Sequence, residues 1–313
     1  MAAQPNIAEL VEKLPPTDRE IEAQKAADKA PQDPAKPPAK PAKEPGASKF
    51  TGPEPEVAHQ LCEQILAGGR ESLTQLIALV RDPASPEFKN YKPEYLLHCL
   101  TLYVGGAGKE ADRKTLHEVL TAELGNEKHP PAVKRSWIRE LQWIGDAATV
   151  KALGGLLTDE ALCDEAASAL VAIGAGAGDV FRKALPAAQG RCRLVMVQNL
   201  GVLRDAKAAE ALKGALRDED RDVRVAAAWA LARLGDPKSV DALIKAADVP
   251  PGLERIKATQ ACLLLADNLA AAGKKKEAAK IYTHLQETRT DPKETYVREA
   301  ALQALHALAG QLF

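Results

Sequence analysis

The sequence predicts an all-α protein, an α-solenoid of stacked helical hairpins. Two observations predict this fold. Apolar residues recur at steps of three and four along much of the chain, as they do on helices that bury one face. In addition, a helix–turn–helix pattern recurs with a period close to 30 residues. A two-helix unit repeated at such a period is typical of a solenoid.

The unit at 220–247 shows the pattern most clearly. Its first helix carries an apolar stripe made of Val223, Ala226, Ala227, Ala230, Leu231 and Leu234. Gly235 supplies the left-handed residue that ends a helix. Asp236 suits the cap of the next helix and Pro237 its first position. The stripe of the second helix consists of Val240, Leu243, Ile244 and Ala247.

Shifted copies of this unit fix the repeat frame. The helix-end residues Ile144, Ile173, Leu203 and Leu234 are 29, 30 and 31 residues apart. Leu203-Arg204-Asp205 and Ile144-Gly145-Asp146 match Leu234-Gly235-Asp236. The copy at 174–180 departs, because glycines replace the single capped turn, and this predicts a local bend.

Asp222-Val223-Arg224, an Ala-rich helix, Leu-Gly-Asp and a second helix together resemble the HEAT family in its short bacterial form, the PBS-lyase-type HEAT repeat. The resemblance is strongest over 130–250 and degenerate over 56–125. It implies a ladder of Asp and Arg between neighbouring repeats. The matching positions hold Arg224, Arg193 and Lys134, and Asp236, Asp205 and Asp146.

The rest of the chain divides around this array. Residues 53–313 form the predicted solenoid, whose end at 253–313 resembles a TPR hairpin through Glu277-Ala-Ala-Lys-Ile281-Tyr282. Residues 24–52 are rich in Pro, Lys and Ala and lack bulky apolar residues, which predicts a disordered linker. This linker is either a plain spacer or a binding segment, namely a Pro-rich ligand or a tether to an acidic surface.

A short amphipathic helix is expected within 1–23. Asn6 suits its cap, and Pro15-Pro16 end it. Its apolar face consists of Ile7, Leu10, Val11 and Leu14. This face docks on the solenoid, binds a partner, or stays disordered, and the sequence leaves these alternatives open.

Composition narrows the function classes. The net charge of −1 argues against a binder driven by bulk attraction to nucleic-acid phosphates. No apolar run is long enough for a transmembrane helix. The five cysteines are scattered and form no CxxC, so each is expected to be a small buried apolar residue, which favours the cytoplasm. The start Ala2-Ala3-Gln4, followed by the linker, supports the alternative of a periplasmic or secreted chain without its leader.

No motif carries chemistry. The lone His117-Glu118 pair is too little for a metal centre, and no HExxH, GxSxG, Walker loop or GxGxxG motif occurs. Trp137, Trp143 and Trp229 lie on first helices and are expected to pack between repeats. We therefore expect no cofactor, no metal and no catalytic residue.

A non-catalytic scaffold for a protein partner is the favoured function. We expect the binding face on the second helices, where the exposed candidates are Glu210, Lys213, Asp241 and Lys245, with the N-terminal face of Ile7, Leu10, Val11 and Leu14 as a second candidate. The alternatives are a bilin-lyase-like or other HEAT-type enzyme subunit, which the resemblance implies, and a nucleic-acid-binding protein.

Overall fold

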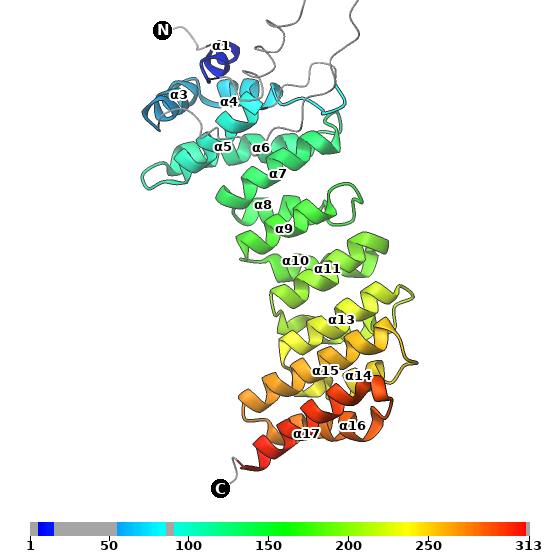
Figure 1. Cartoon of the computed structure of the whole chain (residues 1–313). Coiled ribbons are helices and arrows are strands. Elements are labelled where there is room, and N and C mark those ends of the chain that lie inside the picture. Colours follow the sequence, from blue (N-terminus) through cyan, green and yellow to red (C-terminus); the bar gives the residue numbers. More distant parts are fainter. Residues whose placement is uncertain (1–5, 16–54, 86–90, 311–313) are drawn as a thin grey trace, which may run out of the picture. The chain divides into compact units, whose positions relative to one another are not determined.

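A computed structural model describes residues 6–15, 55–85 and 91–310 (Figure 1). These residues are helical with short connections, and no strand occurs among them. The all-α prediction is therefore confirmed. The chain divides into an N-terminal unit, Met1–Ser136, and a C-terminal unit, Trp137–Phe313.

The N-terminal unit consists of paired helices and one short additional helix. Its elements are α1 (Ile7–Glu12), α3 (Pro55–Ala67), α4 (Gly69–Ala78), α5 (Tyr91–Gly105) and α6 (Glu110–Leu124). Helix α3 packs on α4 and α5, and α6 packs on the same two helices. The degenerate region at 56–125 is therefore built from helical hairpins as well.

Helix α1 docks on this unit. Ile7, Leu10, Val11 and Leu14 are all buried, and α1 packs against α4 and α5. The side chain of Asn6 accepts a hydrogen bond from the Glu9 N–H, which confirms the expected cap. Of the three alternatives for this helix, the structure shows the docked one. The predicted linker at 24–52 lies outside the described residues.

The C-terminal unit is a stack of hairpins. Its first helices are α7 (Pro131–Ile144, which begins before the unit boundary), α9 (Cys163–Ile173), α11 (Gly190–Val202), α13 (Arg221–Leu234) and α15 (Leu253–Ala271). Its second helices are α8 (Ala147–Gly154), α10 (Ala177–Ala184), α12 (Ala209–Ala215), α14 (Val240–Ala247) and α16 (Lys275–Thr288), and α17 (Thr295–Gly310) ends the stack. Because α9, α11, α13 and α15 pack side by side in that order, the predicted solenoid is confirmed here.

The first helices α11 and α13 end in the predicted way, with a left-handed residue followed by an Asp that caps the next element. Gly235 is left-handed, with φ 68°, and Asp236 accepts a hydrogen bond from the Lys238 N–H in the turn that opens α14. Arg204 occupies the glycine position of the preceding copy and is also left-handed, with φ 49°. Gly145 is different, because its φ is not positive; a Cβ there would lie 2.6 Å from Ile173 Cδ1. Close packing requires that glycine.

The irregular turn at 174–180 is confirmed. Gly174 and Gly176 both have positive φ, of 75° and 78°, and Gly176 is in the left-handed helical conformation. Gly178 lies so close to Asp205 that a Cβ would be 2.6 Å from its Oδ2. The first two glycines turn the chain between α9 and α10, and the third permits the approach of the next repeat.

Three arginines, Arg193, Arg224 and Arg255, each pair with a carboxylate further along the stack and form a ladder between repeats. The carboxylates that they bind are not the expected Asp146, Asp205 and Asp236. Arg224 donates to Glu254 Oε1 and Oε2 at 2.6 and 2.7 Å, and Arg255 makes the same two-pronged contact with Glu294 at 2.6 and 2.9 Å. Arg193 pairs with Asp218. Each arginine also donates to a backbone carbonyl just before its own helix.

The expected acidic partners were wrong for a geometric reason. Asp146, Asp205 and Asp236 follow the C-terminal ends of first helices, where their side chains cap the next element. Asp205 does pair with an arginine of the neighbouring repeat, but this is Arg182 of α10 and not one of the expected cations. The ladder arginines lie at the N-terminal ends, about 20 Å away along a 14-residue helix such as α13. Lys134, the third expected cation, forms no ion pair within the described part of the chain, and Arg255 extends the ladder instead.

Small side chains form the core of the stack. Helix α13 buries Ala226, Ala227, Ala228, Ala230 and Ala232, which lets neighbouring helices approach closely. Four of the five free cysteines, Cys62, Cys163, Cys192 and Cys262, are buried, and Cys99 is half-buried. Burial raises the pKa of the Cys262 thiol to about 12. The interpretation of these four cysteines as small core residues is confirmed.

Candidate functional site

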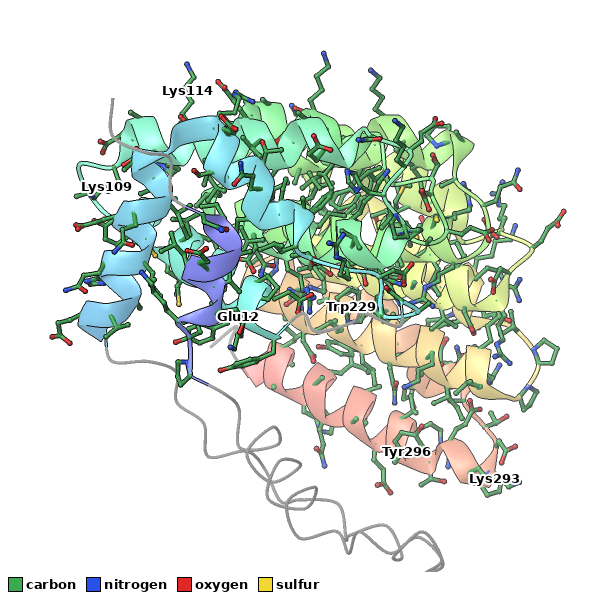
Figure 2. All side chains as sticks on the ribbon, turned by 90° about the horizontal axis from the view of Figure 1, so that it is seen from above. Glu12, Lys109, Lys114, Trp229, Lys293 and Tyr296 are labelled. Atoms are coloured by element: carbon green, nitrogen blue, oxygen red, sulfur yellow. The ribbon has the colours of Figure 1, made fainter. Side chains whose placement is uncertain are left out.

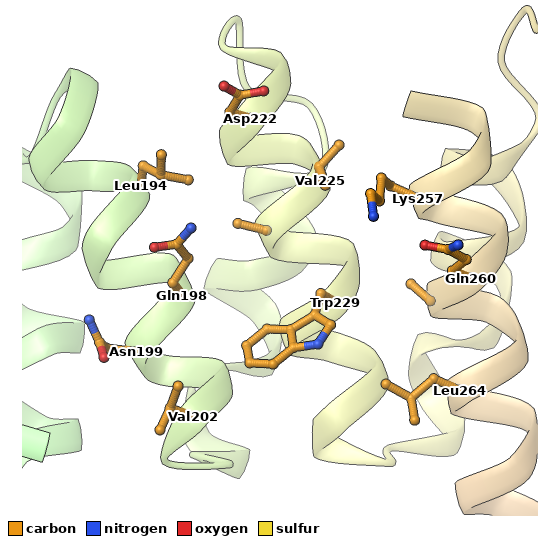
Figure 3. Close-up of a pocket in the computed structure, with 12 residues that line it drawn as sticks. Leu194, Gln198, Asn199, Val202, Asp222, Val225, Trp229, Lys257, Gln260 and Leu264 are labelled. Carbon is orange, nitrogen blue, oxygen red and sulfur yellow. The ribbon is translucent and has the colours of Figure 1, made fainter. Parts of the chain in front are cut away.

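The candidate site is a groove across the first helices α11, α13 and α15 (Figure 3), with a volume of ≈ 870 Å³. Its lining is mostly apolar, with a few polar side chains at the surface. The lining residues are Leu194, Gln198, Asn199, Val202, Asp222, Val225, Ala226, Trp229, Lys257, Gln260, Ala261 and Leu264.

The repeat frame explains this lining. The ladder arginines Arg193, Arg224 and Arg255 stand 31 residues apart, so the same step relates all equivalent positions on the three helices. The step produces three rows: Leu194, Val225 and Ile256; Gln198, Trp229 and Gln260; and Val202, Arg233 and Leu264. All of these except Ile256 and Arg233 line the groove. The ladder thus fixes the register that aligns the rows.

Trp229 forms the centre of the middle row, between Gln198 and Gln260 (Figure 3). The guanidinium carbon of Arg233 lies 4.8 Å from the centre of the indole ring, a cation–π contact. Arg233 Nε in turn donates to the Gly201 carbonyl at 3.1 Å. This chain of contacts holds the half-buried indole at the surface of α13.

Gly201 determines how closely α11 approaches α13 beside the indole. A Cβ on this residue would lie 2.7 Å from Ala230 Cβ and 3.0 Å from Trp229 Cζ3. Any larger residue would separate the helices or displace the indole. The shape of the groove therefore depends on Gly201, which lies inside α11 and is needed for close packing, not for ending a helix.

Three polar side chains in the groove have no partner within the described residues. Gln198, Lys257 and Gln260 form no hydrogen bond or ion pair there, and all three are exposed. Elsewhere on the same helices the charged side chains are largely paired, as the ladder shows. The groove therefore offers two amides and one ammonium to a ligand.

The four candidates on second helices lie in the other layer of the stack. Lys213 donates to Glu210 Oε1 at 3.0 Å within α12, and Asp241 on α14 pairs with Lys280 on α16. Lys245 is exposed. The groove therefore lies on a different set of helices from the predicted binding face. Trp229 was expected to be a packing residue, and the groove was not predicted. The one sequence signal for it is the 31-residue step that relates Gln198, Trp229 and Gln260, and this step alone does not show that the three side chains line a groove.

The candidate partner-binding residues near the N-terminus are buried within their own unit. Ile7, Leu10, Val11 and Leu14 are at most 5% exposed, because they pack on the N-terminal unit. In this state they contact their own chain. Their contact with a partner stays a prediction that requires α1 to undock.

The described residues offer no metal-binding cluster of three or more His, Cys, Asp or Glu side chains. His117 is buried on α6, with Nε2 3.3 Å from Thr121 Oγ1. Trp137 is fully buried, as expected of a packing residue, whereas Trp143 is 59% exposed. Within the described ranges, no helix combines the length and the apolar character that a bilayer crossing requires.

A buried arginine near the end of the stack was not foreseen. Arg289 is fully buried and donates to the Ala247 carbonyl and to Asp248 Oδ1, both at 3.0 Å. Burial alone would raise the pKa of Asp248, but hydrogen bonds from His284 and Arg289 outweigh it and lower that pKa. All these groups are satisfied, so this network joins α14 to α16 and leaves nothing for a ligand.

Comparison with known proteins gives one family match. A model described as HEAT repeats matches residues 178–263. A comparison with curated proteins finds no match. Solved structures with a similar fold include an engineered protein, at 20% identity with a TM-score of 0.42, covering 81% of this chain and 74% of that one. Another is the complex of CpcE and CpcF of phycocyanin lyase from Nostoc sp. PCC7120, at 18% identity with a TM-score of 0.39, covering 84% of this chain and 99% of that one.

The family match covers every residue that lines the groove except Leu264. It includes the whole of α11 and α13 and the first half of α15. The ladder arginines Arg193, Arg224 and Arg255 lie within it, whereas Glu294, the partner of Arg255, lies beyond it. Residues 178–263 of this chain are therefore HEAT repeats.

Proposed function

We propose that this chain is a non-catalytic scaffold that binds a protein partner in the groove of α11, α13 and α15. The groove carries the proposal, because it places an aromatic side chain at the centre of an apolar surface whose polar groups Gln198, Lys257 and Gln260 have no partner among the described residues. Protein interfaces concentrate their binding energy in such central aromatic residues. Their polar groups at the edge contribute orientation more than affinity.

The shape of the site favours an extended partner. The groove crosses three helices, and neighbouring packed helices are about 8–10 Å apart. A segment lying across it would meet the Gln198, Trp229 and Gln260 row in succession. The two amides can donate to and accept from the backbone of such a segment, while the indole contributes apolar contact area.

The test compares the two layers of the stack. The full chain and its variants are immobilised and exposed to a lysate of the source organism, and retained proteins are quantified by mass spectrometry. We expect Trp229→Ala to weaken capture of a specific protein by about 30-fold, as for a central aromatic residue worth about 2 kcal/mol. Trp143→Ala is the matched control, because Trp143 is exposed on α7 outside the groove.

Charge reversal of the second helices completes the test. Lys213→Glu with Lys245→Glu should leave the captured protein unchanged if the groove binds it. Loss of capture by this double variant, with Trp229→Ala unaffected, would instead place the partner on α12 and α14. Circular dichroism checks that each variant keeps its helical content.

A further inference from the structure

We propose that the surface of α4 and α5 covered by α1 is a second protein-binding site, which accepts an amphipathic helix of a partner once α1 is displaced. The site lies in the N-terminal unit and involves none of the groove residues. The proposal therefore stands independently of the proposed function.

The packing of α1 describes the ligand that this surface fits. The buried residues Ile7, Leu10 and Val11 occupy positions i, i+3 and i+4 of α1. Leu14, at i+7, is also buried and lies in the turn that follows the C-cap Lys13. This is the spacing by which an amphipathic helix places its apolar face in a groove of another protein. The solvent side of α1 is formed by Ala8 and Glu9, which are exposed.

A lysine of the site recognises the charge of the docked helix. Glu12 lies at the C-terminal end of α1 (Figure 2). Lys92 Nζ lies 2.6 Å from Glu12 Oε2 and 3.5 Å from the Glu12 carbonyl oxygen. It thus contacts both an acidic side chain and the negative end of the helix. The fitting partner helix therefore carries apolar residues at i, i+3, i+4 and i+7 and an acidic residue at i+5.

Helix α1 has the character of a separable occupant. It spans six residues, and helices much shorter than about 12 residues are not stable alone in water. Its helical form therefore depends on docking. Residues 16–54 separate it from α3 in the sequence, a length of chain that could span roughly 130 Å at full extension. Sequence separation alone therefore does not confine α1 to this surface.

Competition between α1 and a partner follows from this connection. A tethered ligand acts at an effective concentration of about a millimolar or less, and the value falls as the tether lengthens. A partner helix in solution must overcome that concentration. Weakening the docking of α1 should therefore raise the apparent affinity of the site for a helix supplied in trans.

The experiment uses the full chain and a fluorescent peptide of residues 5–15, PNIAELVEKLP, as the probe. We expect Leu10→Glu, which undocks α1, to bind the probe at least tenfold more tightly than the unmodified chain in fluorescence polarisation. Ala8→Glu is the matched control, because it places the same charge on the exposed side of α1. A probe carrying Leu10→Glu should not bind, and Lys92→Glu should weaken binding to the undocked chain by roughly threefold to tenfold.

Three results would overturn the proposal. The first is absence of probe binding by a Leu10→Glu chain whose circular dichroism matches that of the unmodified protein. The second is equal binding by both chains. The third is a dimer of the unmodified chain in analytical ultracentrifugation that Leu10→Glu abolishes, because the occupant would then be a second copy.

Hydrogen exchange of the unmodified chain supplies an independent measurement, useful if Leu10→Glu fails to fold. The amides of α1 should exchange at least tenfold faster than those of α4 and α5, since undocking does not require unfolding of the unit. Equal protection of the three helices would contradict a separable α1.

Discussion

The backbone of Arg204 is strained, because a residue with a side chain adopts a positive φ of 49° there. Arg204 is the one residue other than glycine with positive φ among those described, and its exposed side chain makes no hydrogen bond or ion pair there. A left-handed conformation costs a residue with a Cβ about 1–2 kcal/mol. We expect Arg204→Gly to raise the free energy of unfolding by about 1 kcal/mol, as measured by urea denaturation followed by tryptophan fluorescence.

The equivalent residue Gly235 provides the reverse control. Gly235→Ala introduces a Cβ at φ 68° and should lower the free energy of unfolding by about 1 kcal/mol. If both substitutions shifted stability in the same direction, the conformation at these two positions would not be the cause.

The ladder arginines should contribute more than exposed arginines of the same helix. Arg224 has a side chain 26% exposed, bonds Glu254 through two N–H groups and also donates to the Asp218 carbonyl at 2.7 Å. We expect Arg224→Ala to lower the free energy of unfolding by about 1–3 kcal/mol. Arg221→Ala, three residues earlier with a side chain 53% exposed, should change it by less than about 0.5 kcal/mol. Equal effects in urea denaturation would reject a special role for the ladder.

At the scale of elements, the approach of α11 to α13 depends on Gly201. Gly201→Ala should lower the free energy of unfolding by about 1–3 kcal/mol, because the new Cβ collides with Ala230 and the indole of Trp229. The fluorescence maximum of Trp229 should shift as well.

Gly214 in α12 is the matched control for this substitution. No atom lies within 4 Å of a Cβ built there, and its φ is not positive. Gly214→Ala should therefore stabilise the protein by up to about 1 kcal/mol through helix propensity. A destabilising effect of similar size at both glycines would show that close packing of α11 and α13 is not what Gly201 provides.

The helices and their ends could be predicted from the sequence because their signals are local. Gly235 and Asp236 act on residues within one turn of themselves, and the stripe of α13 is a pattern within one helix. The cap residue Asn6 likewise accepts a hydrogen bond from the N–H of Glu9, only three residues ahead. Such signals need no knowledge of the neighbouring repeat.

The ladder partners and the groove could not be predicted in the same way. Glu254 and Glu294 lie 30 and 39 residues from the arginines that they bind, and many carboxylates are equally distant in the sequence. Trp229 looked like a packing residue, since only the alignment of three helices shows that it stands between Gln198 and Gln260. These features depend on the register between repeats, which a stripe within one helix does not specify.

At the scale of the whole molecule, the unfolding of the C-terminal unit can be followed separately, because that unit contains all the tryptophans. The three tryptophans, Trp137, Trp143 and Trp229, all belong to the C-terminal unit, and so do the three ladder arginines. Tryptophan fluorescence therefore follows the C-terminal unit alone, whereas circular dichroism follows both units. A comparison of the two signals separates the unfolding of the ladder from that of the N-terminal unit.

This separation allows a test of the ladder by pH. Hydrogen bonds from Arg224 and Arg255 hold the pKa values of Glu254 and Glu294 below the ordinary value of 4.5. A carboxylate with a lowered pKa in the folded state stabilises that state fully above its unfolded pKa. This contribution is lost as the pH falls through the lowered folded value. The unfolding midpoint in urea, followed by fluorescence, should therefore be steady from pH 7 to about 5 and fall steeply below about 4.5.

Removing the Arg224–Glu254 ion pair should make the unfolding midpoint depend less on pH. In Arg224→Ala, Glu254 loses the donor that lowers its pKa, so less stability remains to be lost on acidification. We expect this variant to be less stable than the unmodified chain at pH 7 and to approach it as the pH falls below about 4. Arg221→Ala should follow the unmodified chain throughout. Parallel curves for Arg224→Ala and the unmodified chain would mean that acid unfolding arises elsewhere, and that the ladder aligns the groove without determining how the repeats respond to protons.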